Sequence, residues 1–112
     1  MNDRELLELA AKAAGIDGEY KTLSHSRRDH FKQIRNFSRE AFVSKGLVWD
    51  PLTDDGDALR LAVKLGMNIE ITDSTVFACS RGNFYEDAKP NPEAATRRAI
   101  VRAAAEIGRA MP

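Results

Sequence analysis

WDPLTDDGDALRLAVKLGMNIEITDSTVFAC, residues 49–79, contains the change of hydrophobic period that decides the class of fold. Within residues 54–65, apolar side chains recur at the spacing of an amphipathic helix, and a glycine follows. Residues 68–72 then alternate between polar and apolar side chains, and residues 75–79 are rich in β-branched and aromatic types. The link between these two runs is too short for a crossover connection, so the stretch predicts one helix followed by an antiparallel hairpin.

The start of this predicted helix is crowded with carboxylates, which either bind a metal or initiate the helix. The aspartates are Asp50, Asp54, Asp55 and Asp57. A calcium loop that began at Asp50 would need a bidentate glutamate at its twelfth position, where the sequence has Leu61. Thr53 is instead a good N-cap, and each carboxylate in the first turn favours the helix dipole by ~0.3–1 kcal/mol. We therefore favour helix initiation, capped by Thr53, over a metal site.

Two further helices are predicted toward the ends of the sequence. Asn2, with a glutamate three residues later, forms a capping pair for a helix over 3–14. Asn91, followed by proline, opens a helix over 92–109, whose many alanines suit close packing against a neighbour. With Phe84-Tyr85 as a possible further strand, these elements predict an α+β fold. We expect one domain, 1–112, arranged as a small α-β-α sandwich in which helices cover an antiparallel sheet.

The segment SHSRRDHFKQIRNFSREAFVSKG, residues 24–46, is predicted to be largely helical, with the helix over 27–44. On a helical wheel its apolar residues fall within an arc of about 140°, whereas a strand would divide them between two faces. These residues are Phe31, Ile34, Phe37, Ala41 and Phe42. The same wheel aligns four bases in a row ~16 Å long, within about 60°. The row is Arg28, Lys32, Arg35 and Arg39.

Charge is distributed unevenly along the chain although it sums to zero. There are 17 basic and 17 acidic residues, so the chain as a whole has no net charge to attract nucleic acid or membrane. Residues 21–45, however, contain seven bases against Asp29 and Glu40, a local balance of 7 − 2 = +5. The predicted basic row would be able to follow several phosphates. The alternative interpretation is that these basic residues form only the solvated flank of a helix and bind nothing.

The sequence contains few signatures of catalysis. His25 and His30 are five residues apart, off the spacing that lets one helix face hold a metal. Cys79 is the single cysteine, which excludes an internal disulfide and suits a reducing compartment. No glycine-rich phosphate-binding loop occurs in the sequence. We expect no enzyme activity, no cofactor and no metal.

Trp49 is the single tryptophan and has two interpretations. An anchor in the core or at its rim is favoured over a platform on which a ligand stacks. Trp49 is included with Arg28, Lys32, Arg35 and Arg39 among the candidate partner-binding residues.

Three stretches of the chain resemble a family of small phage proteins, described as the phage ABA-sandwich domain and akin to NinX-type phage proteins. They are NDRELLELAAKAAGI (2–16), WDPLTDDGDALRLAVKLGMNIEI (49–71) and AATRRAIVRAAAEIGRAM (94–111). The similar blocks read W-x-P-L-x-x-D-G-D-A-x-x-L-A-x-x-L and A-x-x-R-A-I-x-R-A-A. The resemblance implies an α-β-α arrangement and a phage or prophage source, but no reaction. Residues from about 20 to 47 depart from the family pattern.

The resemblance implies a non-enzymatic phage accessory protein that acts by binding. We expect it to counter a host defence system, either by inhibiting a host defence protein or by sequestering a small nucleotide signal. The alternative is a nucleic-acid-binding or regulatory module that uses residues 27–44, and an assembly accessory without a ligand is a third option. A homodimer is compatible with each of these. The N-terminus has no signal-peptide pattern and no stretch reaches the ~20 apolar residues of a membrane span, so we expect the host cytoplasm.

Overall fold

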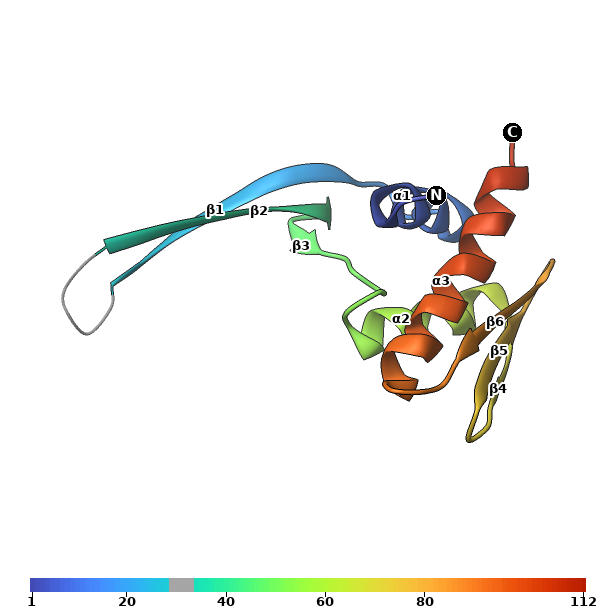
Figure 1. The fold of residues 1–112 in the computed structure, drawn as a ribbon. Helices are drawn as coiled ribbons and strands as arrows, with labels where there is room; N and C mark the ends of the chain where they lie inside the picture. The colour runs from blue at the N-terminus through green and yellow to red at the C-terminus, as the bar shows by residue number, and fades with distance from the viewer. Residues whose placement is uncertain (29–33) are drawn as a thin grey trace.

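In a computed structural model, the described residues of the protein form three helices and two small antiparallel sheets (Figure 1). The structure describes residues 1–28 and 34–112, with side chains for 1–24 and 39–112. The elements are α1 (Asp3–Ala14), β1 (Glu19–Arg28), β2 (Ile34–Ser44), β3 (Leu47–Val48), α2 (Asp55–Leu65), β4 (Asn68–Ile71), β5 (Thr75–Cys79), β6 (Asn83–Asp87) and α3 (Pro92–Ala110). The predicted α+β class is confirmed, and none of the helices within the described residues is long and apolar enough to cross a membrane.

Helix α3 lies at the centre of the fold, between the sheet β4–β5–β6 and the other two helices (Figure 1). On its helix side, Val101 is fully buried in a cluster with apolar residues of α1 and α2. On its sheet side, Ala95, Ala99 and Ala103 recur every four residues and pack against Val76 and its neighbours. This stripe of small side chains lets the sheet approach the helix closely. The prediction that helices cover an antiparallel sheet is therefore confirmed.

The contact between α1 and α3 depends on a glycine. A Cβ atom placed on Gly108 would lie 2.0 Å from the carbonyl oxygen of Leu9, far inside van der Waals contact. Glycine is normally unfavourable within a helix, by roughly 0.5–1 kcal/mol relative to alanine. Its presence in α3 is explained by this close approach of two helix backbones.

The aspartate cluster is used in starting α2, but the cap differs from the predicted one. Asp54, not Thr53, is the N-cap, and its side chain accepts a hydrogen bond from the backbone N–H of Asp57 at 2.8 Å. The Asp57 carboxylate in turn accepts from the backbone N–H of Asp50 at 2.9 Å. The prediction of Thr53 was wrong because the chain makes a turn over 50–54 before the helix begins, where the Asp54 N–H donates to the Asp50 carbonyl.

The predicted strands 68–72 and 75–79 are present as β4 and β5, and β6 adds a third strand where Phe84-Tyr85 was expected. The register places Ile69 opposite Ala78 and Ile71 opposite Val76, on the face that α3 covers. Ile69 is half-buried, but Ile71 remains 60% exposed. Strand β4 is the edge of the sheet, so the helix layer does not reach over its end.

The helix predicted over 27–44 was wrong for residues 27–28 and 34–44, which belong to the two strands of a long β-hairpin, and its residues 29–33 lie outside the described part of the chain. Strands β1 and β2 pair antiparallel from Glu19 opposite Val43 to Arg28 opposite Ile34. A strand's stability comes from its cross-strand partner, and a helical wheel drawn on one segment does not include that partner. The predicted stop at Gly46 is instead a two-residue turn in which Lys45 and Gly46 have φ of 52° and 78°, as hairpin turns of this twist require.

Candidate functional site

The arm, defined as strands β1 and β2, extends away from the rest of the molecule, which we call the body (Figure 1). Ten residues of strand at ~3.3 Å each make a ribbon of about 33 Å. The radius of gyration is 16.1 Å, against about 13 Å for a compact chain of this length. Beyond the pairing of Val43 and Ser44 with β3, the described sheet gives β2 no partner other than β1. The arm is therefore a two-stranded ribbon.

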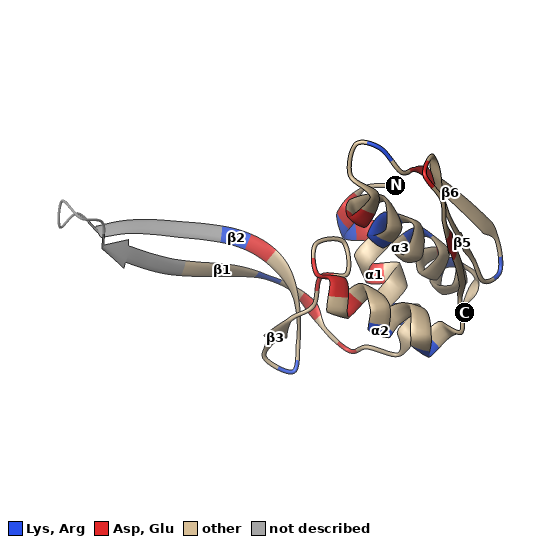
Figure 2. Cartoon of the chain, turned by 90° about the horizontal axis from the view of Figure 1, so that it is seen from below, with Lys and Arg blue, Asp and Glu red and all other residues tan. Residues whose placement is uncertain are grey.

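The arm and the body have opposite net charges. Residues 19–44, from the start of β1 to the end of β2, contain six bases and three acids, 6 − 3 = +3, so the other residues of the neutral chain carry 11 − 14 = −3. Lys21 and Arg39 are exposed. Figure 2 shows both basic and acidic positions on the described part of the arm nearest the body. The register places Arg27 opposite Arg35.

The predicted basic row is not a single stripe. Arg28 belongs to β1 and is opposite Ile34, whereas Arg35 and Arg39 belong to β2. Lys32 lies outside the described residues. Because neighbouring positions of a strand alternate between faces, the register groups Arg35 and Arg39 with Arg27 rather than with Arg28. Arg28, Arg35 and Arg39 lie on one two-stranded ribbon, but their predicted alignment along one face of a helix was wrong.

Three aromatic side chains join the arm to the body. The Phe42 ring meets Tyr20 and Trp49 edge to face, with ring centroids 5.7 Å and 5.6 Å away. The guanidinium of Arg4 in α1 lies 4.6 Å from the centroid of the Tyr20 ring. Burial raises the pKa of Tyr20 above its usual value, and the nearby Asp50 carboxylate adds to this effect, so its hydroxyl stays protonated at neutral pH. Trp49 packs against the core, as expected of an anchor.

A groove of about 520 Å³ lies at the base of the arm and is bordered by three elements. It runs between the end of α1, the turn from β2 to β3, and α2. Its apolar lining is Ile16, Leu47, Val48 and Trp49, and its ionisable lining is Asp17, Lys45, Asp57, Arg60 and Lys64. Leu47 is 74% exposed and lies next to Val48, which is 39% exposed. This groove, called the arm-base groove below, combines an exposed apolar surface with three cations.

The arm-base groove could not be predicted from the sequence, because its cations come from two segments that are separate in the chain. Lys45 is in the β2–β3 turn, and Arg60 and Lys64 are one turn apart on α2. Arg60 is already paired, at 2.8 Å from Asp57 and 3.8 Å from Asp54. The only local signal is the i, i+4 spacing of Arg60 and Lys64, and this spacing is common on solvated helices.

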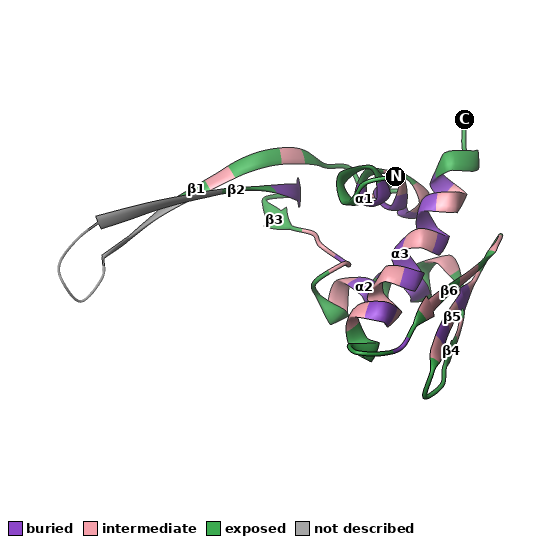
Figure 3. Ribbon diagram, viewed as in Figure 1, coloured by how far each residue is buried: buried purple, intermediate pink, exposed green. Residues whose placement is uncertain are grey.

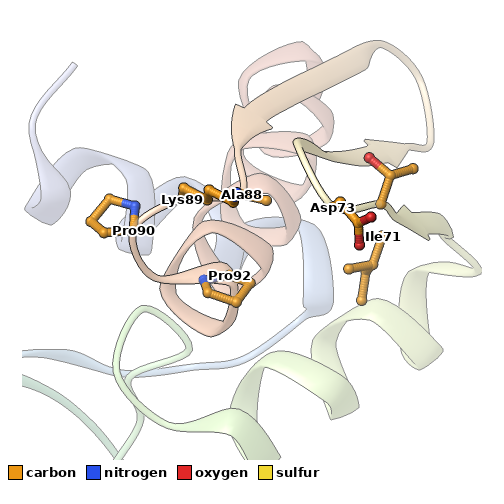
Figure 4. A pocket seen from close by; sticks show the side chains of 7 residues that line it. Ile71, Asp73, Ala88, Lys89, Pro90 and Pro92 are labelled. Atoms are coloured by element: carbon orange, nitrogen blue, oxygen red, sulfur yellow. The ribbon is translucent and has the colours of Figure 1, made fainter.

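Two other hollows have fewer ionisable lining residues than the arm-base groove. One of about 690 Å³ lies between the β4–β5 turn and the start of α3, with Asp73 and Lys89 as its only ionisable lining residues (Figure 4). The second is an apolar cleft of about 300 Å³ between α2, β4 and α3, where Leu59 and Ile71 are exposed. The charged residues at its rim include Asp55 and Arg97, which pair with each other at 2.6 Å.

Residues 1–28 and 34–112 contain no group of three or more His, Cys, Asp or Glu side chains arranged to hold a metal ion. No protein-family model, no curated protein and no solved structure matches the chain. The resemblance to small phage proteins consequently stays a prediction. The candidate site rests on the arm and the arm-base groove.

Proposed function

We propose that the protein acts by binding, without catalysis, and that its partner is a nucleic acid whose sugar–phosphate backbone lies along the arm. The observation that carries this proposal is the separation of charge: residues 19–44, which contain the two strands of the ribbon, carry +3, and the rest of the chain carries −3. A basic surface that an acidic body does not cover is suited to a polyanion, because phosphate contacts supply most of the affinity in non-specific nucleic-acid binding.

The form of the arm supports the same partner. The major groove of duplex DNA is about 12 Å wide and admits a two-stranded β-ribbon, and single strands also bind along basic surfaces. A ribbon of two strands is only marginally stable in water by itself. Binding of a phosphate backbone would therefore stabilise the arm as well as use its charge.

Inhibition of a host defence protein and sequestration of a nucleotide signal rest on the resemblance to phage proteins, and they stay predictions. So does the formation of a homodimer. A nucleic acid is preferred here because the arm is the part of the described structure with the strongest local excess of charge.

The test is fluorescence anisotropy with labelled single-stranded and duplex oligonucleotides over a range of salt concentrations. The logarithm of the association constant should fall linearly with the logarithm of the salt concentration, with a slope of ~0.7–0.9 per phosphate contacted. The arm variant Arg27→Glu/Arg35→Glu/Arg39→Glu should lose most of the affinity and reduce the slope by about 2–3.

The matched control reverses three exposed charges on the body, as Lys12→Glu/Arg81→Glu/Lys89→Glu. It changes the net charge of the protein by the same amount as the arm variant. If both variants weaken binding equally, overall charge rather than the arm is responsible and the proposal fails. Absence of binding by the unmodified protein at low salt would also refute it.

A further inference from the structure

We propose that the arm-base groove binds an unpaired nucleotide, so that the substrate is a single-stranded rather than a fully paired nucleic acid. This inference rests on the proposed function and adds to it a site and a substrate class. The backbone of the strand lies on the arm, and the base of one nucleotide enters the groove beside Trp49, with its phosphate near Lys45 and Lys64.

The apolar lining of the groove suits the flat face of a base. Leu47 and Val48 form the two-residue strand β3 and are 74% and 39% exposed, next to the half-buried Trp49. Exposed apolar side chains that gather in a concave surface mark a binding site more often than chance exposure does. A volume of about 520 Å³ lies within the range of sites that hold small organic molecules.

The cations of the groove are placed to take a phosphate. Within the described part of the chain, Lys45 and Lys64 are in no ion pair, whereas Arg60 is held by Asp57 and Asp54. The two carboxylates in the lining are Asp17 and Asp57. Asp57 is occupied by Arg60 and by the backbone N–H of Asp50. Two lysines are thus available to an anionic ligand.

The groove is continuous with the arm. Lys45 directly follows the last residue of β2, so the backbone of the ribbon leads into the groove, although the neutral residues 41–44 separate Lys45 from the charged part of the arm. Its left-handed backbone, with φ of 52°, belongs to the turn that forms one wall of the groove. One nucleic-acid strand can therefore contact both the ribbon and the groove.

The walls of the groove select against a paired base. They are formed by the end of α1, the β2–β3 turn and α2, so a base must enter from the open side without its complement. In a duplex this requires unpairing and unstacking, whereas the bases of a single strand are already accessible. The proposal therefore predicts preference for single strands.

The test exploits Trp49, the chain's single tryptophan and a wall of the groove. The unmodified protein is titrated with a 12-residue oligothymidylate and with a blunt duplex of the same length, and binding is followed by anisotropy and by Trp49 emission. The single strand should bind about tenfold more tightly and change the emission saturably, while the duplex should leave the emission unchanged.

The double variant Lys45→Gln/Lys64→Gln should weaken single-strand binding about tenfold and leave duplex binding within about twofold. The control Lys12→Gln/Lys89→Gln removes two exposed body lysines and should change neither. Two results would overturn this inference and leave the proposed function standing. One is full single-strand affinity in the groove variant, and the other is single-strand binding to the unmodified protein with no change in Trp49 emission. Loss of all binding in the unmodified protein would overturn both.

Discussion

The body and the arm differ in what stabilises them. In the body, α3 is buried on two sides, and fully buried residues such as Val76 and Val101 lie in its two clusters (Figure 3). In the arm, the strands are paired with each other, and Lys21, Thr22 and Ser24 are all exposed. The buried residues Ala41, Phe42 and Val43 are at its base. Stability is therefore concentrated in the body and at the junction, which leaves the rest of the arm free to carry charge.

The two regions also differ in how their charges are used. Arginines of α3 are paired within the body: Arg97 with Asp55 at 2.6 Å, Arg98 with Asp3 at 3.1 Å, and Arg102 with Glu86. Such pairs are worth little stability when exposed, but they do neutralise the charge locally. In the arm, Lys21 pairs with Glu19 at 3.7 Å, but residues 19–44 contain six bases against three acids, so an excess of three positive charges remains. The difference supports a binding role for the arm.

The junction should give the largest effect on stability. Phe42→Ala removes a buried ring that contacts both Tyr20 and Trp49, and we expect it to cost about 3–5 kcal/mol of unfolding free energy. Urea unfolding followed by circular dichroism measures this. Tyr85→Ala, which removes an aromatic ring that is 59% exposed on the body, is the control and should cost far less. Equal costs for the two variants would mean that the junction does not hold the arm to the body.

The second-largest loss of stability is expected where α1 packs closely against α3 in the body. Gly108→Ala should cost about 1–3 kcal/mol, because the added methyl group meets the Leu9 carbonyl and forces α1 away from α3. Gly56→Ala is the matched substitution in the first turn of α2, where the added atom would meet only the movable ends of side chains. It should be neutral or slightly stabilising, as glycine-to-alanine changes in helices usually are. Similar thermal unfolding for the two variants would contradict the packing argument.

A smaller effect distinguishes the two caps proposed for α2. Asp54→Ala should lower the unfolding free energy by ~1 kcal/mol, because it removes the acceptor for the Asp57 N–H. Thr53→Ala should change it by less than ~0.5 kcal/mol, as is usual for a surface substitution away from a cap. Chemical denaturation of the two single variants decides between them, and a greater loss with Thr53→Ala would restore the cap first predicted from the sequence.

The smallest effect on stability is expected from shortening the arm. Leu23 and Arg39 are register partners, so Asn-Gly in place of residues 24–38 can close a tight hairpin between them. The body and the junction are untouched, and the unfolding free energy should change by less than ~1 kcal/mol, because the ribbon adds little to the core. Oligonucleotide binding should be lost. A large drop in stability would show that the arm contributes to the fold, against the contrast drawn here.

The helices and the sheet of the body were predictable because their signals are local. The stripe of α2, the capping asparagines Asn2 and Asn91, and the alternation in β4 are each contained in fewer than about 20 residues. The basic segment was also visible as a local excess of charge. The arm-base groove was not visible, because its lining comes from three elements that meet only after folding.

The sequence by itself determined the α+β class, the positions of α1, α2 and α3, and the separation of charge between residues 21–45 and the rest. These depend on side-chain period, capping and composition, which act over one or two turns of chain. Only the tertiary structure decided that residues 19–28 and 34–44 form a ribbon, that Asp54 rather than Thr53 caps α2, and that Lys45 and Lys64 line one groove. A strand is stabilised by a partner distant in sequence, and a groove by several elements at once, so neither is specified by the residues of one segment.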